Sequence, residues 1–418
     1  MTELSHVVIT GLGVLAPNGL GKDRFWESLE RGVSGIRRIS RFDPSEFPVQ
    51  VGGEITGFQA SEFLDYKKAR RLDRSTQLAI AAAKMAIEDS RLDLTKEDRR
   101  EVGVMAGTAI GGQEWDFEQY DIFKTKGLDR ANPFTAINTF PNACSSHVSI
   151  EFQVTGPSDT ISSGCSSGAA AIGYAYDCLR YGRAQTIIVV GTDAPLNPPV
   201  FGAFCIARVL SRNSGSTNIP KPFDKHRDGI VIAEGAGALI LENLDHALRR
   251  QAHIYAEVLG WASSCDAYHM MNSEPNGEQL ALAIQKALKM AGLESHEVDY
   301  VKAHGDGSIS HDNSETKAIK ASLGEQSRKI PVSSIKSMIG HTQGASGVIE
   351  VVGCALAIEK STVPPTINYS EADPECDLDY VPNHARPQKI DVAICNTLGF
   401  GGKNVVILLG KHNGGRHW

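Results

Sequence analysis

The sequence has no pair of cysteines in a C-x-x-C arrangement and no cysteine–histidine cluster at the spacing of a zinc site. Its eight cysteines are scattered singly over 418 residues. A disulfide scaffold or a zinc module would need paired or regularly spaced residues, so both classes are excluded. We therefore expect free thiols, a reducing cytoplasmic setting and no metal site.

Long apolar runs and a strong charge of one sign are also missing. No apolar run approaches the roughly 20 residues that a transmembrane helix needs, and the opening "MTELSHVVITG" lacks the basic and apolar regions of a signal peptide. Lys and Arg total 42 against 49 Asp and Glu, and the net charge is −7 with no basic field. Neither a membrane nor a nucleic acid is therefore an expected partner.

Short β-branched runs indicate buried strands, and glycine, with 41 residues, clusters in the turns. The runs are too apolar for half-exposed strands and too short for buried helices. They lie at residues 6–17, 101–109, 186–194, 235–243, 256–262, 300–305, 391–400 and 403–410. Between them, helical spacing of apolar residues appears at 75–90 and 276–293, and the almost wholly apolar segment 347–361 must lie inside. This alternation predicts a layered α/β fold.

The two halves of the chain echo each other. "GAGALILEN" (235–243) closes the first half and "GFGGKNVVILLG" (399–410) closes the second, each with a Gly-rich entry before an apolar strand. The chain has no Pro- or Ser-rich linker. This pattern predicts a duplicated fold with halves at residues 1–250 and 251–412, and we expect the seam near residues 245–256.

One cysteine, Cys165, lies in "DTISSGCSSGAAAIGYAYDCLRYG" (159–182), among small residues where a strand pattern changes to a helix pattern. The free N–H groups and dipole of a helix N-terminus stabilise a thiolate, so we expect a lowered pKa there. Small neighbours would let a substrate carbonyl approach. The alternative is a buried cysteine on a tight turn.

A thiolate nucleophile needs a base or a cation within reach, and two histidines have the right context. His304 ends a strand in "YVKAHGDGS", and His341 sits in the Gly-rich turn of "SSIKSMIGHTQGASG". Enzymes of the α/β class place their chemistry on such strand-end turns. The alternative for each is a hydrogen-bonded turn histidine. A papain-like Cys hydrolase also fits the distance from Cys165 to His304, although its local signature is absent.

A third Gly-rich turn, "NTLGFGGKN" (396–404), contains Phe400. Glycines free the backbone to direct N–H groups at a ligand oxygen, as an oxyanion hole requires. The alternative is a bare hairpin turn. By contrast, the charged segment "KPFDKHRDGIVIAEGAG" (221–237) has the composition of a structural ion-pair loop.

Together these features resemble the β-ketoacyl-acyl-carrier-protein synthases, condensing enzymes of the thiolase fold. The resemblance extends from "VVITGLGVLAPNG" to "GFGGKN". It rests on Cys165 at a helix start, "AHG" with His304, "KSMIGH" with Lys336 and His341, "PFD..RDG", and "GFGG" with Phe400. It implies an acyltransferase with an α/β, thiolase-like, duplicated α-β-α-β-α layered fold.

Within this family, "SGCSSG" and "HGDGS" are similar to the catalytic ketosynthase subunit of type II polyketide synthases, whereas fatty-acid enzymes tend to read "ACA" and "HGTST". Such subunits pair with a chain-length-factor paralogue that has lost the cysteine. Because Cys165 is present, this chain would be the catalytic member. The alternative is a homodimeric β-ketoacyl-acyl-carrier-protein synthase II of fatty-acid elongation.

The resemblance also implies roles for the matching residues. Cys165 would carry the acyl group, and its backbone N–H with that of Phe400 would hold the oxyanion. His304 and His341 would stabilise the enolate from malonyl-acyl carrier protein, and Lys336 would orient the site, with Glu315 and Glu350 in support. No cofactor is implied, since phosphopantetheine arrives on the carrier protein.

Binding residues follow by the same resemblance. Ser308, Asp306, Gly401 and Gly402 would contact the substrate, although Asp306 replaces a Ser or Thr and a carboxylate cannot donate a hydrogen bond unless protonated. The acidic carrier protein would dock on basic residues. These are Lys67, Arg70 and Arg71 in "YKKARRLDR" (66–74), with Arg208 as a further candidate.

Overall fold

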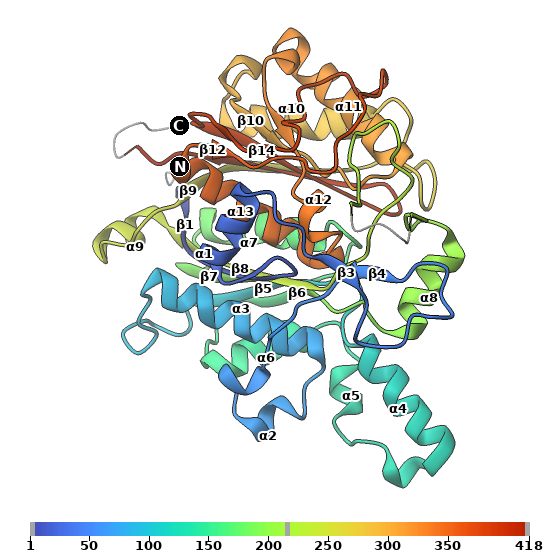
Figure 1. The fold of residues 1–418 in the computed structure, drawn as a ribbon. Helices are drawn as coiled ribbons and strands as arrows, with labels where there is room; N and C mark the ends of the chain where they lie inside the picture. Colours follow the sequence, from blue (N-terminus) through green and yellow to red (C-terminus); the bar gives the residue numbers. More distant parts are fainter. Residues whose placement is uncertain (1–4, 214–217, 414–418) are drawn as a thin grey trace.

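The computed structural model describes residues 5–213 and 218–413, which form layers of helices and strands (Figure 1). One half of the main sheet runs in the order β1 (Val7–Ala16), β8 (Gly235–Asn243), β7 (Thr186–Asp193), β5 (Val102–Gly107) and β6 (Ser158–Ile161). The other half runs in the order β9 (Ala256–Cys265), β15 (Lys403–Gly410), β14 (Val392–Gly399), β10 (Tyr300–Lys302) and β11 (Val332–Ser333). The strands predicted from the sequence are all present.

The two halves repeat one pairing pattern. In each, the first three strands pair antiparallel and the last two join in parallel. Residues 7–9 of β1 pair with residues 256–258 of β9, and this pairing joins the two halves into one hydrogen-bonded sheet. The strands of the first half span residues 7–243 and those of the second span 256–410. The duplicated, layered α/β architecture predicted from the sequence is confirmed.

Helices fill the middle and cover both outer faces. Between the two halves lie α7 (Ser167–Arg180) and α13 (Ser346–Lys360), which contact strands of both. Outside them lie α3 (Arg74–Ser90) and α6 (Ala143–Phe152) on one face, and α10 (Glu278–Ala291) and α11 (Ile309–Leu323) on the other (Figure 1). Residues 346–358 of α13 are all buried, as its apolar sequence predicted.

Close packing of the two central helices depends on a missing side chain. A Cβ on Gly347 of α13 would lie 2.3 Å from the backbone nitrogen of Ala169 of α7. That distance is far below van der Waals contact, so only glycine allows the two backbones to approach this closely. The N-terminal ends of both helices are thereby brought side by side at the centre of the molecule.

The remaining elements are short or peripheral. They are β2 (Gly19–Leu20), α1 (Lys22–Glu30), β3 (Ile36–Arg38), β4 (Val51–Gly53), α2 (Tyr66–Ala69), α4 (Gln113–Lys126), α5 (Thr135–Asn138), α8 (Pro198–Ala207), α9 (Leu244–Arg249), α12 (Lys336–Ile339), β12 (Thr362–Val363) and β13 (Arg386–Pro387). In Figure 1, α4 and α5 project away from the layers. Among the described residues, none of the helices has the length and apolarity needed to cross a membrane.

Candidate active site

Loops from both halves meet at the N-terminal ends of the two central helices. Cys165 lies two residues before α7 begins, and His341 lies between α12 and α13. His304 follows β10 by two residues, and Phe400 begins the turn that joins β14 to β15. The ring centres of His304 and His341 are 5.4 Å apart, and the backbone of Phe400 hydrogen-bonds to Cys165. The structure thus brings these four predicted residues together.

The thiol of Cys165 is almost completely enclosed, with 5% of the residue exposed. Its Sγ donates to Oε1 of Gln343 at 3.6 Å. Burial raises the pKa of Cys165 to about 12, and the backbone hydrogen bond from Phe400 offsets only part of that rise. The expectation of a lowered pKa is therefore wrong. The residue precedes the helix, and the cost of desolvating a thiolate exceeds the benefit of the helix dipole.

His304 carries its ring proton on Nε2. Its Nδ1 accepts a hydrogen bond from the backbone N–H of Leu398 at 3.1 Å, and Nζ of Lys336 lies 3.2 Å from the same atom. Because a backbone N–H must face a lone pair, the proton belongs on the other nitrogen. Burial, with the charge of Lys336, lowers the pKa of His304 to about 4. Within the described residues Nε2 is buried and makes no well-aligned hydrogen bond, and Oδ2 of Asp306 lies 3.4 Å from it, so this N–H can turn to a substrate oxygen.

His341 is held in the same tautomer. The backbone N–H of Gln343 donates to its Nδ1 at 3.2 Å, and the hydroxyl of Ser346 lies 3.1 Å from that atom. The proton therefore resides on Nε2. Burial, with the charge of Lys336 and the neighbouring His304, holds the pKa of His341 well below its usual range. Both rings are thus neutral N–H donors at pH 7.

Two neutral N–H donors beside a buried thiol suit one kind of chemistry. They can stabilise negative charge that develops on a carbonyl oxygen without giving up their protons. Since each donor is fixed by a backbone N–H on its far nitrogen, no reorganisation is required when that charge appears. The site is therefore built to hold an enolate or a tetrahedral oxyanion next to a sulfur nucleophile.

Lys336 is buried against His304, where its Nζ donates to the backbone oxygen of His304 at 2.7 Å and pairs with Glu350. A second buried lysine, Lys302 of β10, reaches the same Glu350 carboxylate at 2.7 Å. Burial lowers the pKa of Lys302, against the opposing effect of Glu350. Sequence reasoning missed Lys302, although a lysine inside the apolar run "YVKAHG" was a visible signal.

Two carboxylates shape the loop that carries His304. Glu315 accepts the backbone N–H groups of His304 at 2.7 Å and Gly305 at 2.8 Å. Asp312 accepts those of Asp306 at 3.2 Å and Gly307 at 3.3 Å. Both acids lie on α11, so the first turns of that helix set the conformation of the loop that carries His304. Glu315 was expected to support the site; Asp312 was not singled out.

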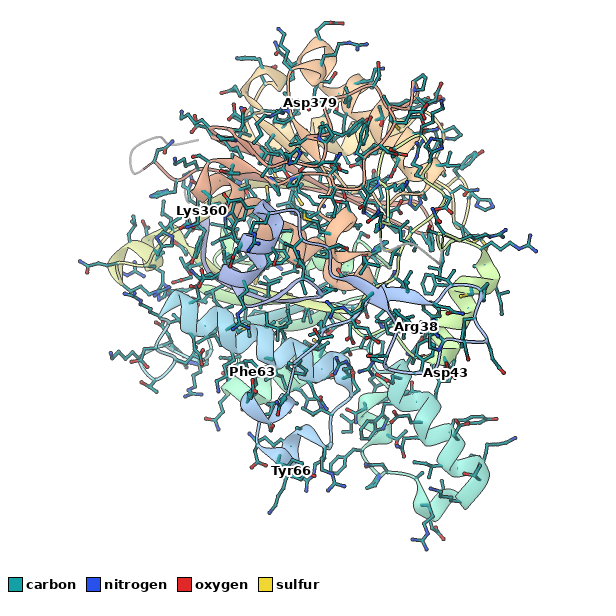
Figure 2. All side chains as sticks on the ribbon, viewed as in Figure 1. Arg38, Asp43, Phe63, Tyr66, Lys360 and Asp379 are labelled. Atoms are coloured by element: carbon teal, nitrogen blue, oxygen red, sulfur yellow. The ribbon has the colours of Figure 1, made fainter. Side chains whose placement is uncertain are left out.

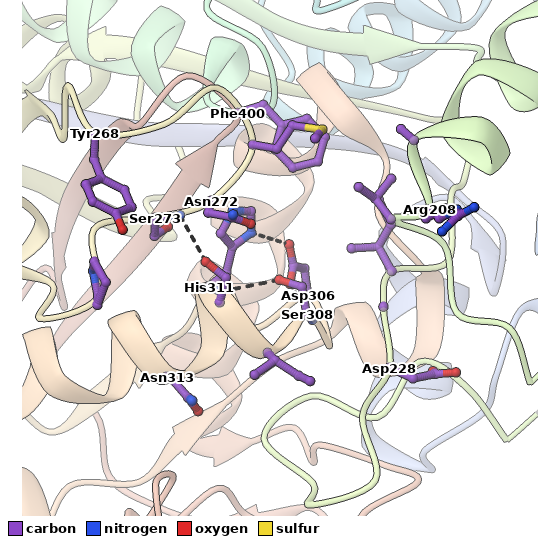
Figure 3. Close-up of a pocket in the computed structure, with 18 of the residues that line it drawn as sticks. Arg208, Asp228, Tyr268, Asn272, Ser273, Asp306, Ser308, His311, Asn313 and Phe400 are labelled. Atoms are coloured by element: carbon purple, nitrogen blue, oxygen red, sulfur yellow. Dashed lines mark hydrogen bonds and ion pairs between the residues drawn. The ribbon is translucent and has the colours of Figure 1, made fainter.

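The carboxylate of Asp306 accepts hydrogen bonds from neighbouring groups of the protein (Figure 3). Its Oδ1 accepts the backbone N–H of Ser308 at 2.8 Å and the Ser308 hydroxyl at 2.7 Å. Its Oδ2 lies 2.7 Å from Nδ1 of His311 and 3.4 Å from Nε2 of His304. Burial opposes ionisation, but the two histidines hold the pKa of Asp306 well below its usual range. The Ser308 hydroxyl, which donates to Asp306, can offer a substrate only its acceptor lone pairs.

His311 completes this arrangement and was missed from the sequence. Ser308 caps α11, which places His311 in the first turn of that helix facing Asp306. The signal was a second histidine seven residues after His304 in "HGDGSISH". The ring of His311 also lies 5.8 Å from that of Phe400, measured between centres.

A cavity of about 560 Å³ leads to these groups from the surface. Asp306, Ser308, His311 and Phe400 line it, and Arg208 stands at its edge (Figure 3). Phe400 is half-buried and borders both the cavity and Cys165.

Gly401 and Gly402 form the tight turn after Phe400, with φ of 81° and 72°. Such backbone angles are open to glycine and strained for other residues. The N–H of Gly401 donates to Met270 at 2.8 Å, and that of Gly402 to Gly399 at 3.1 Å. Both N–H groups are thus used within the protein, and these glycines act on the site through the turn shape that orients Phe400.

The predicted docking cations are exposed but do not form one patch within the chain. Lys67 and Arg70 belong to α2 or its end, and Arg71 follows them, its guanidinium 4.9 Å from the ring centre of Phe134. Arg208 ends α8, and Figure 1 shows α2 and α8 well separated. Only Arg208 lies beside the cavity.

His304, Asp306 and His311 offer ligand-capable atoms within 4.8 Å of one another. A metal would need the lone pair of Nε2 on His304, and that atom carries the proton, since Nδ1 accepts the Leu398 N–H. Metal-ligating histidines instead donate from their far nitrogen. The donor set therefore does not suit a metal ion.

Comparisons with known proteins agree with this geometry. The family model "Beta-ketoacyl synthase, N-terminal domain" matches residues 4–247, and "Beta-ketoacyl synthase, C-terminal domain" matches residues 255–370. A 3-oxoacyl-[acyl-carrier-protein] synthase 2 from Synechocystis is 43% identical over 411 residues, which cover 98% of this chain and 99% of that protein.

Solved structures give the same result. A type II PKS ketosynthase in complex with its acyl-carrier protein and bound to a hexaketide is 36% identical, with a TM-score of 0.91, over 98% of this chain and 100% of that one. The ishigamide ketosynthase/chain length factor is 33% identical, with a TM-score of 0.92 and the same coverage. The thiolase-like fold is confirmed, and the chain belongs to the β-ketoacyl synthase family of condensing enzymes.

Proposed function

We propose that this condensing enzyme is the catalytic ketosynthase subunit of a type II polyketide synthase, working in the cytoplasm. It would join an acyl group on Cys165 to a malonyl unit on acyl carrier protein. The observation that carries the proposal is the pair of neutral Nε2–H donors, on His304 and His341, beside the buried thiol.

The first half-reaction loads the enzyme. The sulfur of Cys165 attacks the thioester carbonyl of an acyl group on carrier-protein phosphopantetheine, and the carbon–sulfur bond to the pantetheine arm breaks. The thiol proton of Cys165 leaves with the departing pantetheine thiol, so that no net charge is created. The backbone N–H groups of Cys165 and Phe400 would hold the oxyanion, at roughly 3–4 kcal/mol for each donor in comparable sites.

The second half-reaction forms the new carbon–carbon bond. Malonyl-carrier protein loses CO₂, and the electron pair of the broken bond forms an enolate whose oxygen accepts from Nε2 of His304 and of His341. The enolate carbon attacks the acyl carbonyl on Cys165, and the sulfur leaves as a thiolate that takes a proton from solvent. The electron pair left on the carbon when CO₂ departs supplies the nucleophile, so we propose no cofactor beyond the phosphopantetheine of the carrier protein.

Binding residues have separate proposed roles. Ser308 would accept from an amide of the pantetheine arm, while Asp306 holds Ser308 in place. Gly401 and Gly402 would let Phe400 swing as a gate that keeps water from the acylated thiol.

The polyketide assignment is supported by the "SGCSSG" and "HGDGS" forms and by the two ketosynthases of similar structure. The second candidate is a homodimeric β-ketoacyl-acyl-carrier-protein synthase II, favoured by the Synechocystis relative. Both need a partner chain. An apolar groove of about 1060 Å³ between α4 and α5, lined by Phe117, Tyr120 and Phe123, supports such an interface.

One experiment separates the two. The purified chain is incubated with acyl- and malonyl-carrier protein, alone and with a chain-length-factor paralogue encoded beside it, and the carrier-bound products are weighed by mass spectrometry. We expect extended products only with the paralogue. Robust elongation by the chain alone would favour the fatty-acid enzyme, and hydrolysis of the acyl thioester without malonyl units would contradict both.

A further inference from the structure

A buried contact between a carboxylate and an imidazole lies directly beside the proposed donor His304. The partners are Asp306, with 1% of the residue exposed, and His311, with 4% exposed. Their contact is 2.7 Å between Oδ2 and Nδ1. In the family pattern quoted above, a hydroxyl residue occupies position 306, so this pair introduces charge where a neutral side chain would suffice.

The surroundings of His311 favour its charged form. Its Nδ1 faces the Asp306 carboxylate, and the backbone of Met271 also favours the proton. Burial opposes the charge, but Asp306 and the more distant Asp312 outweigh it and raise the pKa of His311. The rings of Phe400 and His304 lie 5.8 Å and 5.9 Å away between centres, and His341 is also close enough to feel the charge of His311. Asp312 itself lies 3.6 Å from Arg227.

The carboxylate stands close to the donor that the reaction needs. Oδ2 of Asp306 is 3.4 Å from Nε2 of His304, which is too long and too poorly aligned for a strong hydrogen bond. An Asp306 anion without a positively charged partner would attract the His304 proton and repel the enolate oxygen that accepts from it. Because the site is buried and its surroundings have a low dielectric constant, both effects would be stronger than in water. The 2.7 Å contact with His311 opposes them by engaging the same Oδ2.

We propose that His311 is a positioning residue for the decarboxylation step, whose protonated ring neutralises Asp306 and keeps that carboxylate from capturing the Nε2–H of His304. This inference rests on the proposed function, since it concerns the donor for the enolate. It follows that condensation requires a protonated His311, and that deprotonation of His311 on the alkaline side exposes the enolate site to an unbalanced carboxylate.

The test is a double-mutant cycle on the full chain, with its partner if one is required. Decarboxylation of malonyl-carrier protein is measured for wild type, His311→Ala, Asp306→Asn and the double variant. We expect His311→Ala to lower kcat ~10-fold or more, with a KM change of less than about threefold, and the double variant to recover most of the loss. His296→Ala, at an exposed histidine between α10 and β10, is the matched control.

Two further readouts separate electrostatics from mere support of the fold. The kcat of wild type should fall on the alkaline side, and that limb should be absent in Asp306→Asn. Imidazole ¹⁵N NMR should show the pKa of His304 raised in His311→Ala and restored in the double variant. His311→Gln keeps a hydrogen-bond donor without the charge. Its kcat for decarboxylation should therefore be low and should not fall further on the alkaline side.

The outcomes are distinct. If His311→Ala and the double variant are equally slow, or if the alkaline limb survives in Asp306→Asn, the proposal is wrong. If His311→Ala fails to fold, the kcat of His311→Gln and the pH profile of Asp306→Asn still test the proposal. A wild-type chain that neither decarboxylates malonyl-carrier protein nor extends an acyl group would instead overturn the proposed function.

Discussion

The backbone N–H of Leu398 donates to Nδ1 of His304 across 3.1 Å, from β14 to the loop after β10. This one bond decides which ring nitrogen carries the proton. It also joins two parallel strands at their carboxyl ends, where α/β proteins place their sites. The position of the His304 ring proton is therefore specified by the sheet itself.

The two histidines should act in decarboxylation and leave acyl transfer largely intact. We expect His304→Ala to reduce CO₂ release from malonyl-carrier protein by about 10²–10³-fold, as for loss of an oxyanion donor. The rate of Cys165 acylation, measured by mass spectrometry of the intact protein, should change much less. Equal loss in both half-reactions would contradict this division of roles.

The pH dependence of decarboxylation gives a second test of the same donors. Since the pKa of His304 is lowered to about 4, its ring stays neutral as the pH falls from 8 to 5. We therefore expect no acid loss of kcat near pH 6.5 from this residue. An acid limb at that pH that disappears in His304→Gln would show the ring to be charged.

The thiol of Cys165 should react slowly at neutral pH in the absence of substrate. With a pKa raised to about 12, its thiolate fraction grows about tenfold for each pH unit between 7 and 10. Iodoacetamide labelling, followed by peptide mass spectrometry, should show this slope for Cys165. Cys165→Ala should abolish condensation, and Cys265→Ser, at an exposed cysteine, is the control that should not. Rapid labelling of Cys165 that is independent of pH would be inconsistent with this environment.

The strands, the central helices and the position of Cys165 at a helix start could be predicted from local sequence, because each depends on periodicity or on small residues. The lowered pKa of Cys165 could not, since the helix dipole is a local feature whereas desolvation depends on the whole packed core. Lys302 and His311 were missed for a related reason: their roles arise from partners, Glu350 and Asp306, that only the folded loops bring into contact.

Reversal of charge at Arg70 and Arg71 should weaken docking of an acidic carrier protein without unfolding the chain. Both residues are exposed at the end of α2, and the guanidinium of Arg70 lies 5.7 Å from the ring centre of Tyr66, which points outward in Figure 2. We expect Arg70→Glu with Arg71→Glu to raise the KM for carrier protein severalfold, and more so at low ionic strength. Lys286→Glu, on the outer face of α10, is the matched control. An unchanged KM would show that the carrier protein does not dock on this surface.

Within the buried cluster of Lys302, Lys336 and Glu350, loss of Lys302 should cost less stability than loss of the Glu350 charge. Lys302→Met keeps Lys336 paired with Glu350 and removes one of two neighbouring cations, so stability should change by less than about 1.5 kcal/mol. Glu350→Gln leaves both ammonium groups buried without a counter-charge and should cost about 3–5 kcal/mol. Urea unfolding measures both. A larger loss in Lys302→Met than in Glu350→Gln would contradict this reading of the cluster.

Acid should destabilise the fold through Glu242, which is the second-last residue of β8 and is completely buried. Burial opposes its charge, but Arg250, His246 and Thr10 outweigh burial and lower the pKa of Glu242 to about 2. A carboxyl with a lower pKa in the folded chain stabilises the fold above its unfolded pKa, and this stabilisation is lost as the pH falls toward 2. The shift corresponds to about 3 kcal/mol.

The measurement is the free energy of unfolding between pH 6 and pH 2 for wild type and Glu242→Gln. Wild type should lose stability steeply below about pH 4.5, the usual pKa of a glutamate. Glu242→Gln should start lower, because Arg250 loses its buried partner, and should fall less over the same range. Glu27→Gln, at an exposed helix pair with Arg31, should follow wild type throughout. Parallel curves for wild type and Glu242→Gln would locate the acid sensitivity in other carboxylates.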